Sequence, residues 1–197
     1  MARVFGRGKA QKSDEETLFL LLCVASLPLL PASLFADAIG RLGEHLFAVG
    51  VLLLCNGILL LLSDALPVGT RAPERLGWLR ALFVGCTQAF GVLPGISRSG
   101  ATITGGRIAG LSGENAVRFS FLLSLPAVLG ASVLELPAFF AHGIGRDTVL
   151  PCFAGFLTAF LVGLGAIKLL RLVAEKKGCT FFGSYTIALG LIAMLIG

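Results

Sequence analysis

Apolar residues gather in six long segments, at roughly residues 18–36, 46–63, 78–94, 117–134, 149–170 and 184–197. A helix that crosses the hydrocarbon core of a membrane needs about 20 such residues, with a range of about 17–25. The third and the last segments are short by this measure. Prolines inside two of the runs predict kinked helices, at Pro28, Pro31 and Pro126. The pattern as a whole predicts an all-α, polytopic transmembrane helical bundle.

Residues 95–116 do not follow this pattern, because hydroxyl side chains, arginine and glycine replace the apolar run. Ser97 or Ser99 can cap a helix that begins near Ala101. Thr102 then lies in the first turn of this helix. With roughly ten residues, the helix is about 15 Å long, half of the hydrocarbon thickness. The bundle is therefore expected to contain a re-entrant half-helix carrying the motif PGISRSGAT, packed in protein or lining a wet cavity.

Basic residues between the apolar segments set the expected topology. Residues 1–17 form a basic N-terminal segment that is predicted to be cytoplasmic, without an evident cleavable signal peptide. Residues 18–197 are predicted to form a single membrane domain. Two further basic groups also favour the cytoplasmic side: Arg71, Arg75 and Arg80, and Lys168, Arg171, Lys176 and Lys177. Both groups lie on the cytoplasmic side only if residues 95–116 complete a crossing of the membrane. A simple re-entrant hairpin instead places the second group on the outer side. The loops alone leave both alternatives open.

The composition agrees with a membrane protein, since 56% of the 197 residues are hydrophobic and only 14% are charged. Soluble domains carry about 25% charged residues. The net charge of +5 is explained by membrane topology and anionic lipid headgroups, and it does not indicate nucleic-acid binding.

Cysteines, histidines and small residues are expected to have structural roles. The cysteines lack CxxC spacing and indicate small apolar side chains, without a disulfide framework or zinc site: Cys23, Cys55, Cys86, Cys152 and Cys179. His45 and His142 lie singly in short connections. Gly155, Ala159 and Gly163 repeat every four residues and predict a seam for a partner helix.

Arg98 is the strongest candidate for chemistry. A charge in the bilayer interior costs about 2.5–3.5 kcal/mol on insertion scales, so an intramembrane arginine is functional by default. The neighbouring hydroxyls and the helix start add donors that bind anions, and the planar guanidinium matches two phosphate oxygens. Gly95 and Gly100 let the backbone approach a bulky anion. These residues predict a phosphate site; the alternative is that Ser97 and Ser99 only cap a helix while Arg98 reaches the lipid headgroups.

Polar residues around the motif are expected to support it. Arg107 and Arg118 are predicted to be interfacial anchors. Glu114 is expected in the first turn of the next helix, with Ser112 as its cap. Gln88, six residues before Pro94 on the preceding helix, can orient the loop.

The stretch TQAFGVLPGISRSGATITGGRIAGL, followed by AVRFSFLLSLPAVLGA, resembles the second signature of the undecaprenyl-diphosphate phosphatases, the bacitracin-resistance proteins. That signature, at residues 88–126 here, is close to Q-x5-P-G-x-S-R-S-G-x-T followed by a helix with F-S-F-L-L-x-x-P. The resemblance covers nearly the whole chain from about residue 18, although Ile96 stands where the family usually has threonine. It implies hydrolysis of undecaprenyl diphosphate to undecaprenyl phosphate and inorganic phosphate in the bacterial cell membrane. This reaction recycles the lipid carrier of cell-wall synthesis and confers bacitracin resistance.

The resemblance also implies roles for individual residues. The implied catalytic residues are Ser97, Arg98 and Thr102. Arg98 clamps the diphosphate, Ser97 hydrogen-bonds or attacks it, and Thr102 assists from the helix start. The implied substrate-binding residues are Gly95, Ser99, Gly100, Ala101 and Gln88. A divalent cation, Mg²⁺ or Ca²⁺, is the implied cofactor, and a polyprenyl diphosphate held among membrane lipids is the implied substrate.

An earlier signature of the family, Q-G-x-x-E-F-L-P-x-S-S-S-G-H, is not found in this chain. In the family it supplies two carboxylates and a histidine, thought to bind a metal or act as acid and base, so the chain resembles a member that lacks its N-terminal third. One general acid or base contributes about 10²–10⁴-fold to a rate. The hypothesis is that this chain is the phosphate-binding half, and that hydrolysis requires the missing half or a homodimer. The alternatives are a non-catalytic lipid-phosphate binder and a flippase- or transporter-like component.

Overall fold

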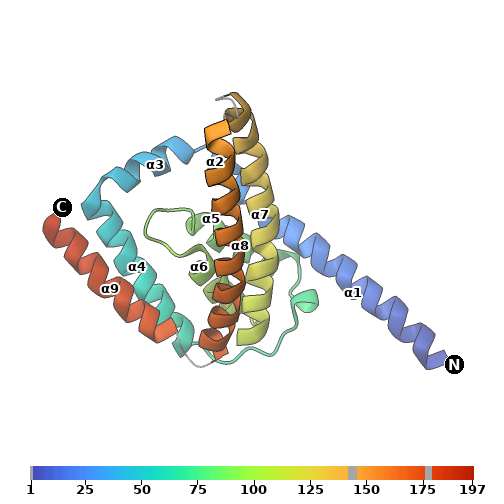
Figure 1. The fold of residues 1–197 in the computed structure, drawn as a ribbon. Coiled ribbons are helices and arrows are strands. Elements are labelled where there is room, and N and C mark those ends of the chain that lie inside the picture. Colours follow the sequence, from blue (N-terminus) through green and yellow to red (C-terminus); the bar gives the residue numbers. More distant parts are fainter. Residues whose placement is uncertain (1, 142–145, 176–178) are drawn as a thin grey trace.

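The computed structural model describes residues 2–141, 146–175 and 179–197, and the side chains of 13–137, 149–167 and 179–197. Within these ranges the regular secondary structure is helical, and the β pairing there is a one-residue bridge between Arg71 and Leu111. The helices (Figure 1) are α1 (Ala2–Ser26), α2 (Leu29–Ser33), α3 (Ala36–Glu44), α4 (Leu46–Ala65), the 3₁₀ turn η1 (Pro73–Arg75), α5 (Trp78–Phe90), α6 (Arg98–Ile108), α7 (Gly113–Ala141), α8 (Arg146–Glu175) and α9 (Cys179–Ile196).

Five segments of the described chain are long and apolar enough to cross a membrane. They are Ser13–Ser33, Leu46–Ala65, Gly113–Pro137, Val149–Ile167 and Cys179–Ile196. The predicted all-α polytopic class is confirmed, and the protein is a multi-pass membrane protein.

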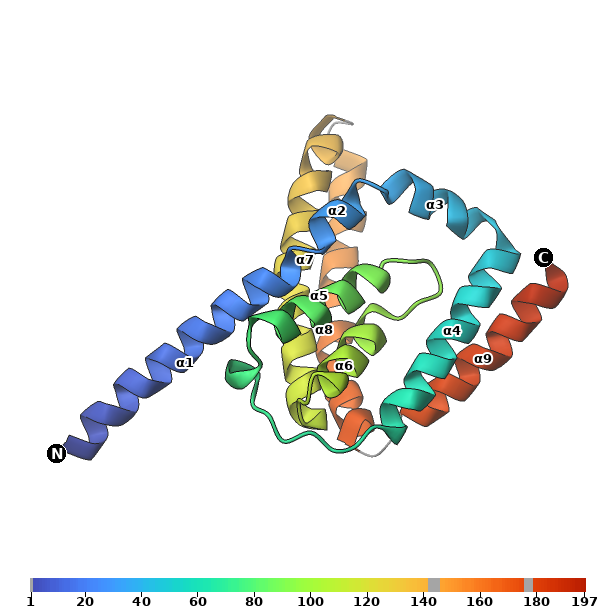
Figure 2. The ribbon, with the colours of Figure 1, turned by 180° about the vertical axis from the view of Figure 1, so that it is seen from behind.

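Proline breaks the first span, as predicted. α1 ends at Ser26 and α2 begins at Leu29, with a turn at Leu27 and Pro28 between them. Residues 2–17 form the first turns of α1. α3, which the apolar pattern alone does not predict, then carries the chain across to the start of α4 (Figure 2). α7, by contrast, continues as one helix through Pro126.

The apolar segment at 78–94 does not cross the membrane. Its helix, α5, ends at Phe90 after 13 residues, a length of roughly 20 Å that falls short of the hydrocarbon thickness of about 30 Å. The remainder of the segment forms the loop that leads into α6, which has 11 residues. α5 and α6 together make a re-entrant hairpin that lies between the α4–α9 pair and the α7–α8 pair (Figures 1 and 2). The predicted half-helix is confirmed, but it begins at Arg98, three residues earlier than expected.

This hairpin decides between the two topologies. The N–H of Arg71, before α5, donates to the carbonyl oxygen of Gly110, after α6, at 3.0 Å, so the chain enters and leaves at one level. α7 and α8 are then two successive crossings, and α9 begins beside Asp64 at the end of α4, where the N–H of Thr180 donates to Asp64 Oδ2 at 2.8 Å. The end of α8 therefore lies on the same face as Arg71.

A simple hairpin thus keeps Arg71 and the described end of α8 on one face, and the expectation that it would separate them was wrong. That expectation counted 78–94 as a full crossing, whereas α5 is one arm of the hairpin. The last part of α8 contains Lys168 and Arg171, whereas Lys176, Lys177 and His142 lie outside the described residues.

α4 and α9 pack together through two pairs of glycines. Gly50 faces Gly190, and Gly57 faces Gly183, so the two glycines of each helix are seven positions apart. A Cβ atom on Gly190 would lie 2.7 Å from the carbonyl oxygen of Gly50, so a larger residue would force the two backbones apart. The seam predicted on α8 has no such partner in the described chain, since a Cβ on Gly155 would meet nothing within 4 Å.

The variant Gly190→Leu is expected to lower the midpoint of thermal unfolding in detergent. Its side chain would separate α4 from α9, and overpacking of this kind costs about 1–3 kcal/mol. The matched control is Gly155→Leu in α8, where the same side chain enters open space and is expected to leave the midpoint unchanged. Equal midpoints for the two variants would contradict the glycine contact.

Candidate functional site

The loop at 91–97 carries the chain from α5 into α6 by a tight turn. The N–H of Ile96 donates to the carbonyl oxygen of Leu93 at 3.1 Å. Gly95 within this turn has a φ of +95°, a conformation that side chains disfavour. A Cβ atom there would also lie 3.0 Å from the carbonyl oxygen of Val49 in α4. Glycine at this position is therefore required both by the turn and by the contact with α4.

Ser97 caps α6 and joins it to α4. Its Oγ accepts the N–H of Gly100 at 3.1 Å, which confirms the predicted cap. Its own N–H donates to Oδ1 of Asn56 at 2.9 Å, and Asn56 is a buried residue in the middle of α4. The Ser99 hydroxyl lies 3.4 Å from Ser97 Oγ, on the exposed side of the helix start. The beginning of α6 thus presents two hydroxyls and first-turn N–H groups halfway along a membrane-spanning helix.

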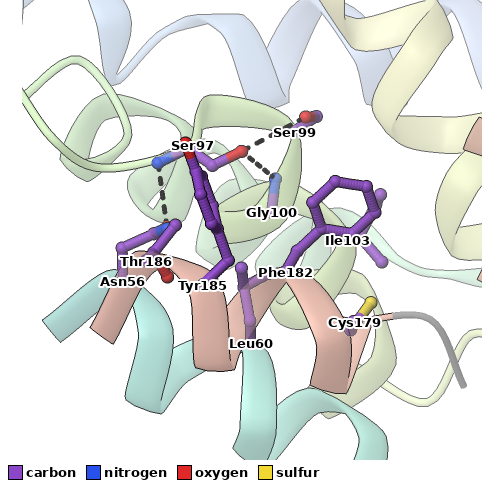
Figure 3. A pocket seen from close by; sticks show the side chains of 10 residues that line it. All are labelled: Asn56, Leu60, Ser97, Ser99, Gly100, Ile103, Cys179, Phe182, Tyr185 and Thr186. Carbon is purple, nitrogen blue, oxygen red and sulfur yellow. Dashed lines mark hydrogen bonds between the residues drawn. The ribbon is translucent and has the colours of Figure 1, made fainter. Parts of the chain in front are cut away.

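A cavity of about 280 Å³ lies beside this helix start, between α4, α6 and α9 (Figure 3). Its lining is Asn56, Leu60, Ser97, Ser99, Gly100, Ile103, Cys179, Phe182, Tyr185 and Thr186. Asn56, Ser97 and Thr186 lie at the end where α6 begins, whereas Leu60 and Phe182 lie further toward the other end (Figure 3). The cavity is therefore polar at one end and apolar over the rest of its length.

Arg98 and Thr102 face the other side of α6, toward α7. Nη2 of the half-buried Arg98 donates to the carbonyl oxygen of Ser124 at 3.4 Å. The buried hydroxyl of Thr102 donates to the carbonyl oxygen of Arg98 at 3.0 Å and lies 2.5 Å from Oγ of Ser120. Of the three predicted catalytic residues, Ser97 alone lines the cavity, although all three belong to the first two turns of α6 and its cap.

The predicted substrate-binding residues are divided in the same way. Ser99 and Gly100 line the cavity, whereas Ala101 is fully buried in the helix packing. Gln88 is 1% exposed, and its Nε2 has no hydrogen-bond partner in the described part of the chain. A buried amide without a partner is costly. Gln88 therefore has unused donor capacity in α5, one turn before Gly91.

An ionic cluster fixes the other end of α6. Nη1 of Arg107 lies 3.2 Å from Oδ1 of Asp64, and both side chains are largely buried. Asp64 Oδ2 also accepts the N–H and the hydroxyl of Thr180 in α9, at 2.8 and 2.9 Å. Arg107 thus connects α6 to α4, and Asp64 in turn connects α4 to α9, so the arginine has a role beyond that of the predicted interfacial anchor. Arg118, which is 58% exposed, lies 3.9 Å from Glu74.

The remaining local expectation at the start of α7 is met. Glu114 lies in the first turn of α7, and Ser112 Oγ accepts the N–H of Asn115 at 3.3 Å. The five cysteines are free thiols.

A ligand group for the divalent cation that the resemblance implies is not found among the described residues. Across the described ranges, no group of three or more His, Cys, Asp or Glu lies close enough together to hold a metal ion. Asp64, near the apolar end of the cavity, is already engaged by Arg107 and Thr180. The chemistry proposed for this chain therefore uses no cation.

Several polar residues at or near the site were not predicted from the sequence as site residues, among them Asn56, Asp64 and Tyr185. Asn56 could have been found, because a polar amide in the apolar run FAVGVLLLCNGILLLL needs a partner inside the membrane. Asp64 and Tyr185 lie near the ends or on the exposed face of their helices, where polar residues are common.

The fold and the site define a multi-pass α-helical membrane protein with a half-polar cavity at the start of a re-entrant helix. The family model described as bacitracin resistance protein BacA matches residues 1–192. The chain belongs to this family.

Curated relatives with the name undecaprenyl-diphosphatase match most of the chain. The protein of Desulforapulum autotrophicum is 39% identical over 188 residues, which are 94% of this chain and 67% of the relative. The protein of Alkaliphilus metalliredigens is 35% identical over 191 residues, covering 96% of this chain and 70% of the relative. That of Desulfosudis oleivorans is 38% identical over 198 residues, covering 98% and 71%. The chain thus spans about two thirds of the length of these relatives.

The variant Asn56→Leu is expected to speed amide hydrogen exchange in residues 91–100, because the N–H of Ser97 loses its acceptor. A buried group left unsatisfied costs about 1–3 kcal/mol, so the thermal midpoint is also expected to fall. Cys55→Leu, at the exposed neighbouring position of α4, is the matched control. Unchanged exchange in 91–100 of Asn56→Leu would contradict the assigned role of the amide.

Proposed function

We propose that this protein hydrolyses undecaprenyl diphosphate to undecaprenyl phosphate and inorganic phosphate. It thereby regenerates the lipid carrier of cell-wall synthesis in the bacterial cell membrane and confers bacitracin resistance. Membership of the family and the names of the curated relatives support this activity. The structural observation that carries it is the serine-capped start of α6, which opens into a half-polar cavity inside the membrane domain.

The diphosphate binds at the start of α6. The positive end of the helix dipole and the first-turn N–H groups favour an anion there. The hydroxyl of Ser97 accepts from Gly100, which leaves its O–H free to donate to a phosphate oxygen. Ser99 adds a second hydroxyl on the exposed side. Ser97 thus acts in this proposal as a hydrogen-bond donor to the diphosphate.

Arg98 supplies the positive charge. Its hydrogen bond to the carbonyl oxygen of Ser124 is 3.4 Å long, which is a weak hold on the guanidinium. A diphosphate at the helix start offers a charged acceptor, and charge-assisted bonds are shorter and roughly twice as strong as neutral ones. Thr102 supports the site indirectly, because its hydroxyl contacts Ser120 and thereby holds α6 against α7. Positioning and charge neutralisation of this kind supply most of the catalysis in phosphoryl transfer.

A carboxylate or imidazole that could act as general acid or base near neutral pH is the part that the cavity itself does not supply, since its titratable side chains are Cys179 and Tyr185. The lining, all within the described residues, contains no Asp, Glu or His. We therefore propose that a second copy of the chain or a further N-terminal segment contributes that group, worth about 10²–10⁴-fold in rate. The second candidate function follows from the same observation. Without such a group, the chain is a lipid-phosphate binder with slow turnover.

The variant Arg98→Ala is expected to reduce phosphate release from undecaprenyl diphosphate by about 10²–10³-fold, the usual cost of removing one donor to a developing anion. Phosphate release is measured on the protein reconstituted in lipid, together with binding of the same substrate. Arg80→Ala, at an exposed position of α5, is the control and is expected to keep full activity.

Phosphate release by the Arg98→Ala variant at the wild-type rate would overturn the proposed site. Binding that depends on Arg98, with no release by the unaltered protein, would overturn hydrolysis and establish the lipid-phosphate binder.

A further inference from the structure

We propose that the cavity between α4, α6 and α9 holds the first isoprenyl units of the polyprenyl diphosphate, while the diphosphate lies at the start of α6. This inference rests on the proposed function and deepens it, because it assigns a tail-binding subsite. Its key residues are Leu60, Ile103 and Phe182, one from each of the three helices.

The order of residues along the three helices carries the proposal. Going from Asn56 to Leu60 on α4 and from Ser97 to Ile103 on α6, the lining changes from polar to apolar. α9 runs the opposite way, and from Thr186 to Phe182 its lining changes in the same sense (Figure 3). An amphiphile with an anionic head at Ser97 would therefore place the carbon chain next to that head among apolar side chains.

The size of the cavity limits how much of the tail it holds. A volume of about 280 Å³ is enough for a short stretch of the tail next to the head group and far too small for a long polyprenyl chain. The rest of the chain must leave toward the lipid. α9 provides this opening, because Phe182 is 41% exposed and Tyr185 is 57% exposed on the wall of the cavity.

The physical role of this subsite is selectivity. Leaving lipid for an apolar cavity gives little hydrophobic free energy, because lipid tails are as apolar as leucine. What the cavity adds is close packing, which depends on the shape of the tail. The fit of the branched tail in the cavity therefore determines the selectivity among lipid diphosphates, whereas most of the affinity comes from the head group.

Cys179 provides a direct test, because its thiol lines the apolar end of the cavity. A single-cysteine protein is made by replacing Cys23, Cys55, Cys86 and Cys152 with serine, and the rate of Cys179 alkylation by a small maleimide is followed in detergent. Geranyl diphosphate, with two isoprenyl units, is expected to slow alkylation several-fold in a saturable way, and inorganic diphosphate is expected to slow it much less. The control is a protein that retains Cys152 alone, on the exposed α8, where neither compound should change the rate.

Other outcomes of this experiment would overturn the inference. They are no protection by geranyl diphosphate, equal protection by inorganic diphosphate, and equal protection by phosphatidylglycerol, which carries an anionic head on unbranched tails. The failure of the proposed function is distinguishable, because it is measured separately as phosphate release. Arg98-dependent hydrolysis without protection of Cys179 rejects the subsite alone, whereas protection without hydrolysis supports the subsite and rejects the enzyme.

A second variant tests the wall of the cavity. Phe182→Ala is expected to weaken binding of geranyl diphosphate several-fold and to leave binding of inorganic diphosphate unchanged, since the ring contacts only the tail. Phe156→Ala, at an exposed position of α8, is the matched control and should change neither. Equal weakening of both ligands by Phe182→Ala would show that the ring supports the fold of the site, and would overturn its assignment to the tail.

Discussion

The hydrogen bond from the N–H of Ser97 to the side chain of Asn56 is the interaction on which the site depends. In a bilayer, a helix that ends halfway exposes backbone groups to a medium that cannot solvate them, and each such group costs several kcal/mol. The tip of the re-entrant hairpin must therefore find hydrogen-bond partners within the protein. Asn56 provides an acceptor from α4, and the hydroxyl of Ser97 accepts the N–H of Gly100. The same groups that allow the chain to turn inside the membrane also create the polar end of the cavity.

The position of Asn56 is in turn set by the packing of α4 against α9. Gly57, the next residue, lies against Gly183, so the backbone of α4 cannot shift here without breaking a close contact. At the far end, Asp64 holds both Arg107 of α6 and Thr180 of α9. α6 is thus attached to the α4–α9 pair at its beginning and at its last turn. The cavity between these attachments is a fixed space, whose walls come from three helices that are distant in sequence.

The sequence predicted the membrane class and the half-helix, because both depend on local properties: the length of apolar runs and the hydroxyl and glycine residues that interrupt them. It failed at 78–94, where Val92 and Leu93 extend the apolar run although they belong to the loop after α5. Hydropathy does not distinguish a helix from an apolar loop. The error in topology followed from this one, since a half-length helix was counted as a crossing. Asn56 and the glycine pairs were missed because their significance lies in a contact between α4 and distant segments.

Ser97, Arg98 and Thr102 lie close together in the sequence, but helix geometry directs their side chains to different sides of α6. Successive residues point about 100° apart around a helix, whereas residues four apart share a face. Arg98 and Thr102 accordingly both face α7, where Ser120 and Ser124 provide their partners. The cap, Ser97, faces the cavity on the other side. The two sides of α6 meet at its beginning, where Ser97 and Arg98 are adjacent in the chain and the first N–H groups have no acceptor within the helix. A phosphate bound at this helix start can be contacted from both sides, so the division of the motif between two faces is compatible with one binding site at the helix terminus.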